Sequence, residues 1–170
     1  MTEEPYNDQS TIMTWHSPWV HSHLTEEPVE MKPARVLVVE DAMCIQRSVG
    51  ALLRKMHMLV DMAEDGQVAC KMADRSLVEN MPYDLILMDM QMPKMNGRDA
   101  TRLLREHGWN RPIIAVSVAP EDEGYEDSIN IGCDDYIGKP VTERKLRNVL
   151  EQFLKALPPA PDMPKDMTNR

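Results

Sequence analysis

Short apolar runs alternate with amphipathic stretches through the middle of the chain. The runs RVLVV from Arg35, DLILM from Asp84 and PIIAVS from Pro112 have the length and composition of buried strands. A weaker run at residues 58–62 predicts another strand, and DDYIGKP at residues 134–140 holds one more. The pattern therefore predicts five strands.

Between these runs, apolar positions recur at the spacing of an α-helix. The predicted helices are residues 43–56, a helix bearing Val68 and Met72 after the Asp65-Gly66 turn, residues 98–106, residues 121–131, and a last helix whose apolar stripe runs from Leu146 to Leu157. Gly132 follows the fourth helix at a position typical of a C-cap. Gly97, after Met-Asn, is interpreted as a turn residue that needs a positive φ.

Apolar strands joined by helical crossovers predict an α/β fold with a parallel sheet covered on both faces. In such a sheet, ligands bind outside the carboxyl ends of the strands. The residues just past the predicted strand ends are Glu40, Asp41, Asp89, Ser117 and Lys139. We therefore expect these five side chains to meet at one edge of the sheet.

The chemistry of this group favours a cation and a phosphoryl group. Three carboxylates within about 4 Å of one another repel by roughly 4 kcal/mol per pair at an effective dielectric constant near 20. Carboxylate and carbonyl oxygens with water suit Mg²⁺, and calcium is less favoured because the chain has no EF-hand-like loop. Lys139 and Ser117 offer a fixed charge and a hydroxyl group to phosphoryl oxygens, which leaves Asp89 as the nucleophile. Alone, Asp41 would be interpreted as a helix N-cap.

Composition limits the alternatives. The chain has 170 residues, 42% of them hydrophobic, which suffice for one buried core. A net charge of -9 opposes attraction to phosphates, so we expect no direct nucleic-acid binding. No apolar run reaches the roughly 18 to 20 residues that span a bilayer, and the acidic N-terminus is unlike a signal peptide. The three cysteines lie far apart without a ligand spacing, which predicts a reducing compartment and a cytoplasmic protein, or a nuclear one in a eukaryote.

The two ends of the chain differ from its middle. Residues 1–34 hold six acids, one lysine and four prolines without apolar periodicity, which predicts a disordered acidic arm. Its segment WHSPWVHSH could bind metal or a partner, but a tail without a fixed ligand is the favoured interpretation. Residues 158–170 form a proline-rich tail. One domain, residues 35–157, is predicted between them.

Four segments in order carry a resemblance to a known family. They are LVVED at residues 37–41, LMDMQMPKMNG at 87–97, RPIIAVS at 111–117 and DDYIGKP at 134–140. The domain resembles the receiver domain of two-component response regulators, particularly receivers attached to hybrid histidine kinases. The resemblance implies a flavodoxin-like, doubly wound, five-stranded parallel sheet in the order 2-1-3-4-5 with five helices.

The resemblance also implies a phosphorelay function. Asp89 would accept a phosphoryl group from a histidine kinase or a histidine phosphotransfer protein. Mg²⁺ would be held by Asp41, Asp89 and the backbone carbonyl of Gln91, and Glu40 would contact it through water. Such a domain would catalyse its own phosphorylation and slow dephosphorylation, without turnover of a separate substrate.

The remaining residues would change position when Asp89 is phosphorylated. Lys139 would bind a phosphoryl oxygen, and Ser117 would swing toward the acyl phosphate and let Tyr136 turn inward. This switch would remodel the face made by the fourth helix, fifth strand and fifth helix, where a downstream protein partner would bind. The bond before Pro140 is expected to be cis.

The sequence departs from the family pattern at a few positions. Val118 follows Ser117 where the family generally has alanine or glycine, and its β-branched side chain would crowd the phosphoryl group. Ala42 and Ile45 replace asparagines that are common after the acidic pair, and Ala119 lacks a polar group that is often present. No catalytic group is removed, so we expect a phosphorylatable domain with altered kinetics.

Two alternatives stand beside this interpretation. The first is a receiver-like docking module with weak or absent phosphorylation. The second is an aspartyl-nucleophile phosphohydrolase, which would need an acid where Gln91 stands. A nucleotide-binding reductase is excluded because no G-x-G-x-x-G follows the first strand. The chain is expected to be a single-domain regulator or a piece of a hybrid kinase, and its N-terminal methionine and arm favour the regulator.

Overall fold

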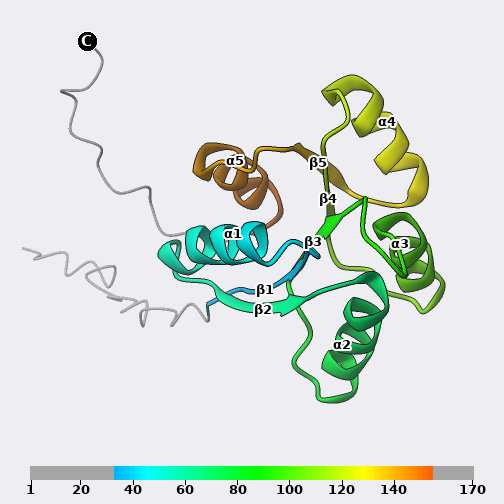
Figure 1. The fold of residues 1–170 in the computed structure, drawn as a ribbon. Helices are drawn as coiled ribbons and strands as arrows, with labels where there is room; N and C mark the ends of the chain where they lie inside the picture. The colour runs from blue at the N-terminus through cyan, green and yellow to red at the C-terminus, as the bar shows by residue number, and fades with distance from the viewer. Residues whose placement is uncertain (1–32, 155–170) are drawn as a thin grey trace, which may run out of the picture. The chain divides into compact units, whose positions relative to one another are not determined.

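The computed structural model describes residues 33–154, in which five parallel strands alternate with five helices (Figure 1). In chain order these are β1 (Arg35–Val39), α1 (Met43–Lys55), β2 (Leu59–Ala63), α2 (Gly66–Val78), β3 (Leu85–Asp89), α3 (Gly97–Glu106), β4 (Ile113–Ser117), α4 (Glu121–Ile131), β5 (Asp135–Gly138) and α5 (Glu143–Phe153). The strand order is β2-β1-β3-β4-β5, so the predicted fold class and sheet order are confirmed. None of these helices is both long enough and apolar enough to span a membrane.

Helices cover both faces of the sheet (Figure 1). Along β1, Val36 and Val38 face the core beneath α1 and α5, whereas Leu37 and Val39 face the core beneath α2 and α3. A strand buried on both faces has no polar alternation, which is why the central strands are continuous apolar runs. Most of the predicted N-terminal arm, the histidine-tryptophan segment, the C-terminal tail and Leu157 lie outside the described residues.

The predicted bounds of β2 were wrong by one residue. Met58 was assigned to this strand, but its backbone N–H donates to the Leu53 carbonyl and closes the end of α1. β2 is an edge strand, and Asp61 interrupts its apolar run by bonding to the Arg35 guanidinium and the Tyr83 hydroxyl, both at 2.9 Å. Because β2 has one neighbouring strand instead of two, less of its surface is buried. It therefore needs fewer apolar residues, and its sequence signal is weak.

The predicted role of Gly97 was also wrong. Gly97 does not have a positive φ; it begins α3, whose N-cap is the preceding Asn96. A Cβ atom at this position would overlap the backbone carbonyl of Asp89. Close approach of two backbone segments therefore requires the glycine. Gly132 does adopt the left-handed conformation, with φ 111°, and caps α4 as predicted.

Candidate active site

The carboxyl ends of β1 and β3 bring three acidic side chains together. Glu40 and Asp41 follow β1, and Asp89 is the last residue of β3 rather than the first residue past it. Each of the three offers a carboxylate oxygen within 4.8 Å of the others. Glu40 and Asp89 are buried, whereas Asp41 is exposed. The structure thus gathers the acids that the sequence placed at one edge of the sheet.

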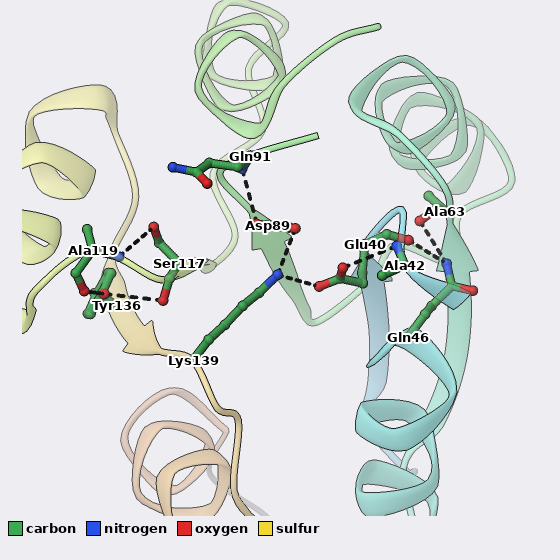
Figure 2. A network of polar contacts seen from close by, with 10 residues as sticks. All are labelled: Glu40, Ala42, Gln46, Ala63, Asp89, Gln91, Ser117, Ala119, Tyr136 and Lys139. Carbon is green, nitrogen blue, oxygen red and sulfur yellow. Dashed lines mark hydrogen bonds and ion pairs between the residues drawn. The ribbon is translucent and has the colours of Figure 1, made fainter. Parts of the chain in front are cut away.

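Lys139 is the positive charge at the centre of this cluster. From the end of β5 its side chain reaches between two acids, and its Nζ donates to Glu40 Oε2 at 2.8 Å and to Asp89 Oδ2 at 2.9 Å (Figure 2). Burial disfavours the charged form of Lys139, but the hydrogen bonds and charges of the two carboxylates outweigh it and raise the lysine pKa. The following Lys139–Pro140 bond is cis, as the resemblance implies.

Backbone N–H groups orient the two buried carboxylates. The Gln91 N–H donates to Asp89 Oδ1 at 3.1 Å, and the Ala42 N–H donates to Glu40 Oε1 at 3.2 Å. The oxygen donors of this cluster are hard ligands, and one of the acids is open to solvent. These residues therefore fit a Mg²⁺ ion, which is bound through one or two carboxylates and keeps part of its water.

Ser117 and Tyr136 meet at the segment that follows β4. The Ser117 hydroxyl oxygen accepts from the Ala119 N–H at 3.3 Å, and the Tyr136 hydroxyl donates to the Ala119 carbonyl at 2.6 Å (Figure 2). Tyr136 is only 9% exposed. Gly124 in α4 makes room for its ring, because a Cβ there would lie 2.6 Å from the ring atom Cε2. The tyrosine thus already lies inward while the Ser117 hydroxyl is bonded to Ala119, so in this structure its inward position does not depend on the expected swing of Ser117.

Two residues near the site were missed by the sequence reasoning. Gln46 in α1 bonds to the backbone of Glu40 and Ala63, and Lys94 in the loop after β3 bonds to Asp65. A polar residue on a helix and a lysine in a loop are common on any surface, so neither carries a signal in the sequence. Their partners become visible only when the strands are assembled.

Comparison with known families decides which domain this is. A sequence profile with the description "Response regulator receiver domain" matches residues 36–151, which is more than half of the chain. The chain belongs to this family. The two-component response regulator ORR41 of Oryza sativa subsp. japonica is 39% identical over 124 residues, a match covering 72% of this chain and 95% of that protein. The receiver domain also matches longer proteins, and it spans 13% of the length of the rice relative named probable histidine kinase 2.

Solved receiver structures share this fold. The receiver domain of sensor histidine kinase PA1611 from Pseudomonas aeruginosa PAO1 has a magnesium ion coordinated in its active site cleft; it is 31% identical, with a TM-score of 0.64, over 74% of this chain and 100% of that chain. A match in the co-crystal structure of Saccharomyces cerevisiae Ypd1, a histidine phosphotransfer protein, with the receiver domain of Ssk1 is 25% identical, with a TM-score of 0.63, over 71% of this chain and 88% of that chain. The chain therefore contains a receiver domain of two-component signalling.

Proposed function

We propose that this receiver domain accepts a phosphoryl group on Asp89 from the phosphohistidine of a histidine kinase or a histidine phosphotransfer protein. The observation that carries the proposal is the Lys139 ammonium group, which bonds to both Glu40 and Asp89 beside the exposed Asp41. An Asp89 carboxylate oxygen would form the new bond to phosphorus while the phosphorus–nitrogen bond of phosphohistidine breaks. The electron pair of that bond would stay on the histidine nitrogen.

The other residues of the cluster would stabilise the transferred group. Asp41, Asp89 and the Gln91 carbonyl would hold Mg²⁺, and Glu40 would contact it through water. The bound ion would supply positive charge opposite the phosphoryl oxygens. Lys139 would exchange its bond to Asp89 for a bond to a phosphoryl oxygen, because its flexible ammonium group already lies beside the acceptor.

Ser117 and Tyr136 would couple this reaction to a downstream protein partner. A Ser117 hydroxyl that turned toward the phosphoryl group would give up its bond to Ala119, the residue to which Tyr136 also bonds. Tyr136 lines a cavity of about 540 Å³ between α4, β5 and α5. Movement at Ser117 would therefore reach the proposed docking face. We further propose a cytoplasmic or nuclear protein with no direct nucleic-acid or membrane binding.

The domain organisation belongs to the same proposal. Residues 35–157 would form the receiver, with an acidic segment, residues 1–34, before it and a proline-rich segment, residues 158–170, after it. The proposal that a histidine phosphotransfer protein donates the phosphoryl group is supported by the co-crystal structure of such a protein, Ypd1, with the similar Ssk1 receiver.

Intact mass tests the proposed reaction. Incubation with Mg²⁺ and phosphoramidate should add one phosphoryl group to the wild type, because the buried Asp89 carboxylate bonds to Lys139 and lies beside the exposed Asp41. The Asp89→Asn variant should gain none, since an amide is not a nucleophile here, and chelation of Mg²⁺ should also abolish the gain. Circular dichroism of Asp89→Asn would verify that the variant is folded.

Failure of the wild type to gain mass calls for a second donor, a phosphorylated histidine phosphotransfer protein. No transfer from either donor to folded wild type would favour the docking module over a phosphorelay receiver. A gain that persists in Asp89→Asn would place the acceptor elsewhere.

Val118 tests the expected crowding of the site. Val118 is 66% exposed and lines an apolar groove of about 600 Å³ together with Lys139 and Pro140. Val118→Ala should raise the rate of labelling by phosphoramidate by roughly tenfold, the lower end of what a methylene-sized change in a pocket produces. Val141→Ala, on the same groove, is the matched control. Equal rates in Val118→Ala and wild type would remove crowding as a cause of altered kinetics.

A further inference from the structure

The end of β2 is bonded to the acidic pair. The Ala63 carbonyl oxygen accepts from the Glu40 N–H at 3.1 Å and from Gln46 Nε2 at 2.9 Å. The same Gln46 nitrogen donates to the Glu40 carbonyl at 3.1 Å, so one amide side chain bridges the ends of two strands (Figure 2). The segment that carries Glu40 and Asp41 is thereby fixed to β2 as well as to α1.

The residues after β2 are bonded to the loop that follows Asp89. Asp65 Oδ2 accepts from Lys94 Nζ at 2.7 Å, and the Gly66 N–H donates to the Met95 carbonyl at 3.0 Å. Asp65 is buried, and its other oxygen caps α2 by accepting from the Val68 N–H. The hydrogen bond from Lys94 lowers the pKa of the Asp65 carboxyl. The loop is thereby anchored to the start of α2.

Lys94 also holds an unfavourable backbone conformation. Its φ is 64°, in the left-handed region that non-glycine residues rarely adopt. Such a conformation persists where the surroundings impose it. The ion pair between Lys94 and Asp65 is a contact of this kind, and so is the hydrogen bond that the neighbouring Met95 carbonyl accepts from the Gly66 N–H. They fix the loop that carries Gln91.

We propose that residues 63–65 form a bracket between the two loops that hold the metal, and that Gln46 and Lys94 are positioning residues for Mg²⁺ binding. Gln46 joins the acidic-pair loop to the bracket, and Lys94 joins the loop after Asp89 to it. Mg²⁺ demands a nearly ideal octahedron, so the spacing of the two loops must be held closely. This inference rests on the proposed function, because the metal belongs to that function.

The test is the Mg²⁺ dissociation constant, measured by calorimetry without a phosphodonor. Lys94→Met and Gln46→Met keep the length of each side chain but remove its donors. Each should weaken Mg²⁺ binding by roughly tenfold, the lower end of the range for residues that orient metal ligands. Lys94→Arg, which retains the charge, should recover most of the affinity.

Lys55→Met is the matched control. The Lys55 side chain is 63% exposed, as is that of Lys94, and it pairs with Glu143 at 3.0 Å, away from both metal-holding loops. The Mg²⁺ affinity of the Lys55→Met variant should equal that of the wild type. Phosphorylation by phosphoramidate gives a second readout, since the two positioning variants should need more Mg²⁺ to reach the same saturating rate.

The outcomes separate this inference from the proposed function. A folded Lys94→Met or Gln46→Met variant that binds Mg²⁺ as tightly as the wild type overturns the bracket, even if its melting temperature falls. The two variants are independent, so misfolding of one leaves the other decisive. If the wild type itself binds no Mg²⁺, the metal part of the proposed function fails and the bracket fails with it.

Discussion

Lys139→Met is expected to lower the free energy of unfolding by about 3 kcal/mol without Mg²⁺, as is typical when one partner of a buried ion pair is removed. The side chains of Glu40 and Asp89 are only 5% and 4% exposed, and both bond to the lysine ammonium group. Methionine replaces the aliphatic part of the side chain but leaves two buried carboxylates without their cation. Chemical denaturation of both proteins would measure the difference.

Mg²⁺ should restore much of this loss. A cation bound to the native state only stabilises it by roughly 2.7 kcal/mol at one hundred times its dissociation constant. We expect the gain to be larger in Lys139→Met than in the wild type, where the ammonium group competes for the same carboxylates. Lys139→Arg keeps the charge and is the control. An equal gain from Mg²⁺ in wild type and Lys139→Met would show that the lysine is not the counter-charge of this site.

Phosphorylation of Lys139→Met should be slower even with saturating Mg²⁺. Loss of one donor to a developing oxyanion costs roughly 10²- to 10³-fold in rate. The measurement is the rate of mass gain with phosphoramidate. A rate equal to that of the wild type would exclude Lys139 from contact with the phosphoryl group.

The parts of the site that could be predicted from sequence are those that follow from strand topology. The sheet alone brings the residues at or just past the ends of its parallel strands to one edge. The residues at such positions are Glu40, Asp41, Asp89 and Lys139. The apolar runs that mark those strands are local signals. No knowledge of side-chain contacts was needed to group the acids with the lysine.

The bracket residues could not be predicted in this way. Gln46 bonds to a carbonyl 17 positions away, and Lys94 bonds to a carboxylate 29 positions away. Apolar periodicity reports which face of an element is buried, but it carries no information on which polar partner lies opposite. The prediction for Gly97 was wrong for a related reason. Glycine is required there because the Asp89 carbonyl, which belongs to another element, packs against it, and local sequence does not show this contact.

Arg105→Met should cost about 2 kcal/mol of unfolding free energy, because it leaves several partly buried backbone carbonyls without their charged donor, and the ion pair that it also breaks is partly exposed. The Arg105 guanidinium donates to the carbonyls of Gly132, Trp109 and Arg111 at 2.8, 2.7 and 2.9 Å. It also donates to Asp134 Oδ2 at 2.6 Å, and the same oxygen accepts from the Ile113 N–H. One side chain thus joins the end of α3 to the segments before β4 and β5.

Arg102→Met is the matched control for this prediction. Arg102 lies one turn earlier on α3, its side chain is 57% exposed, and it pairs with Asp99 at 3.6 Å. Its loss should cost less than about 0.5 kcal/mol, as for surface ion pairs. Folded Arg105→Met should still be phosphorylated, because the hydrogen bonds of Arg105 go to the segments before β4 and β5 and not to the acids of the active site. If urea denaturation gave the two variants equal stability, the hydrogen bonds of Arg105 would not hold α3 to the α4–β5 segment.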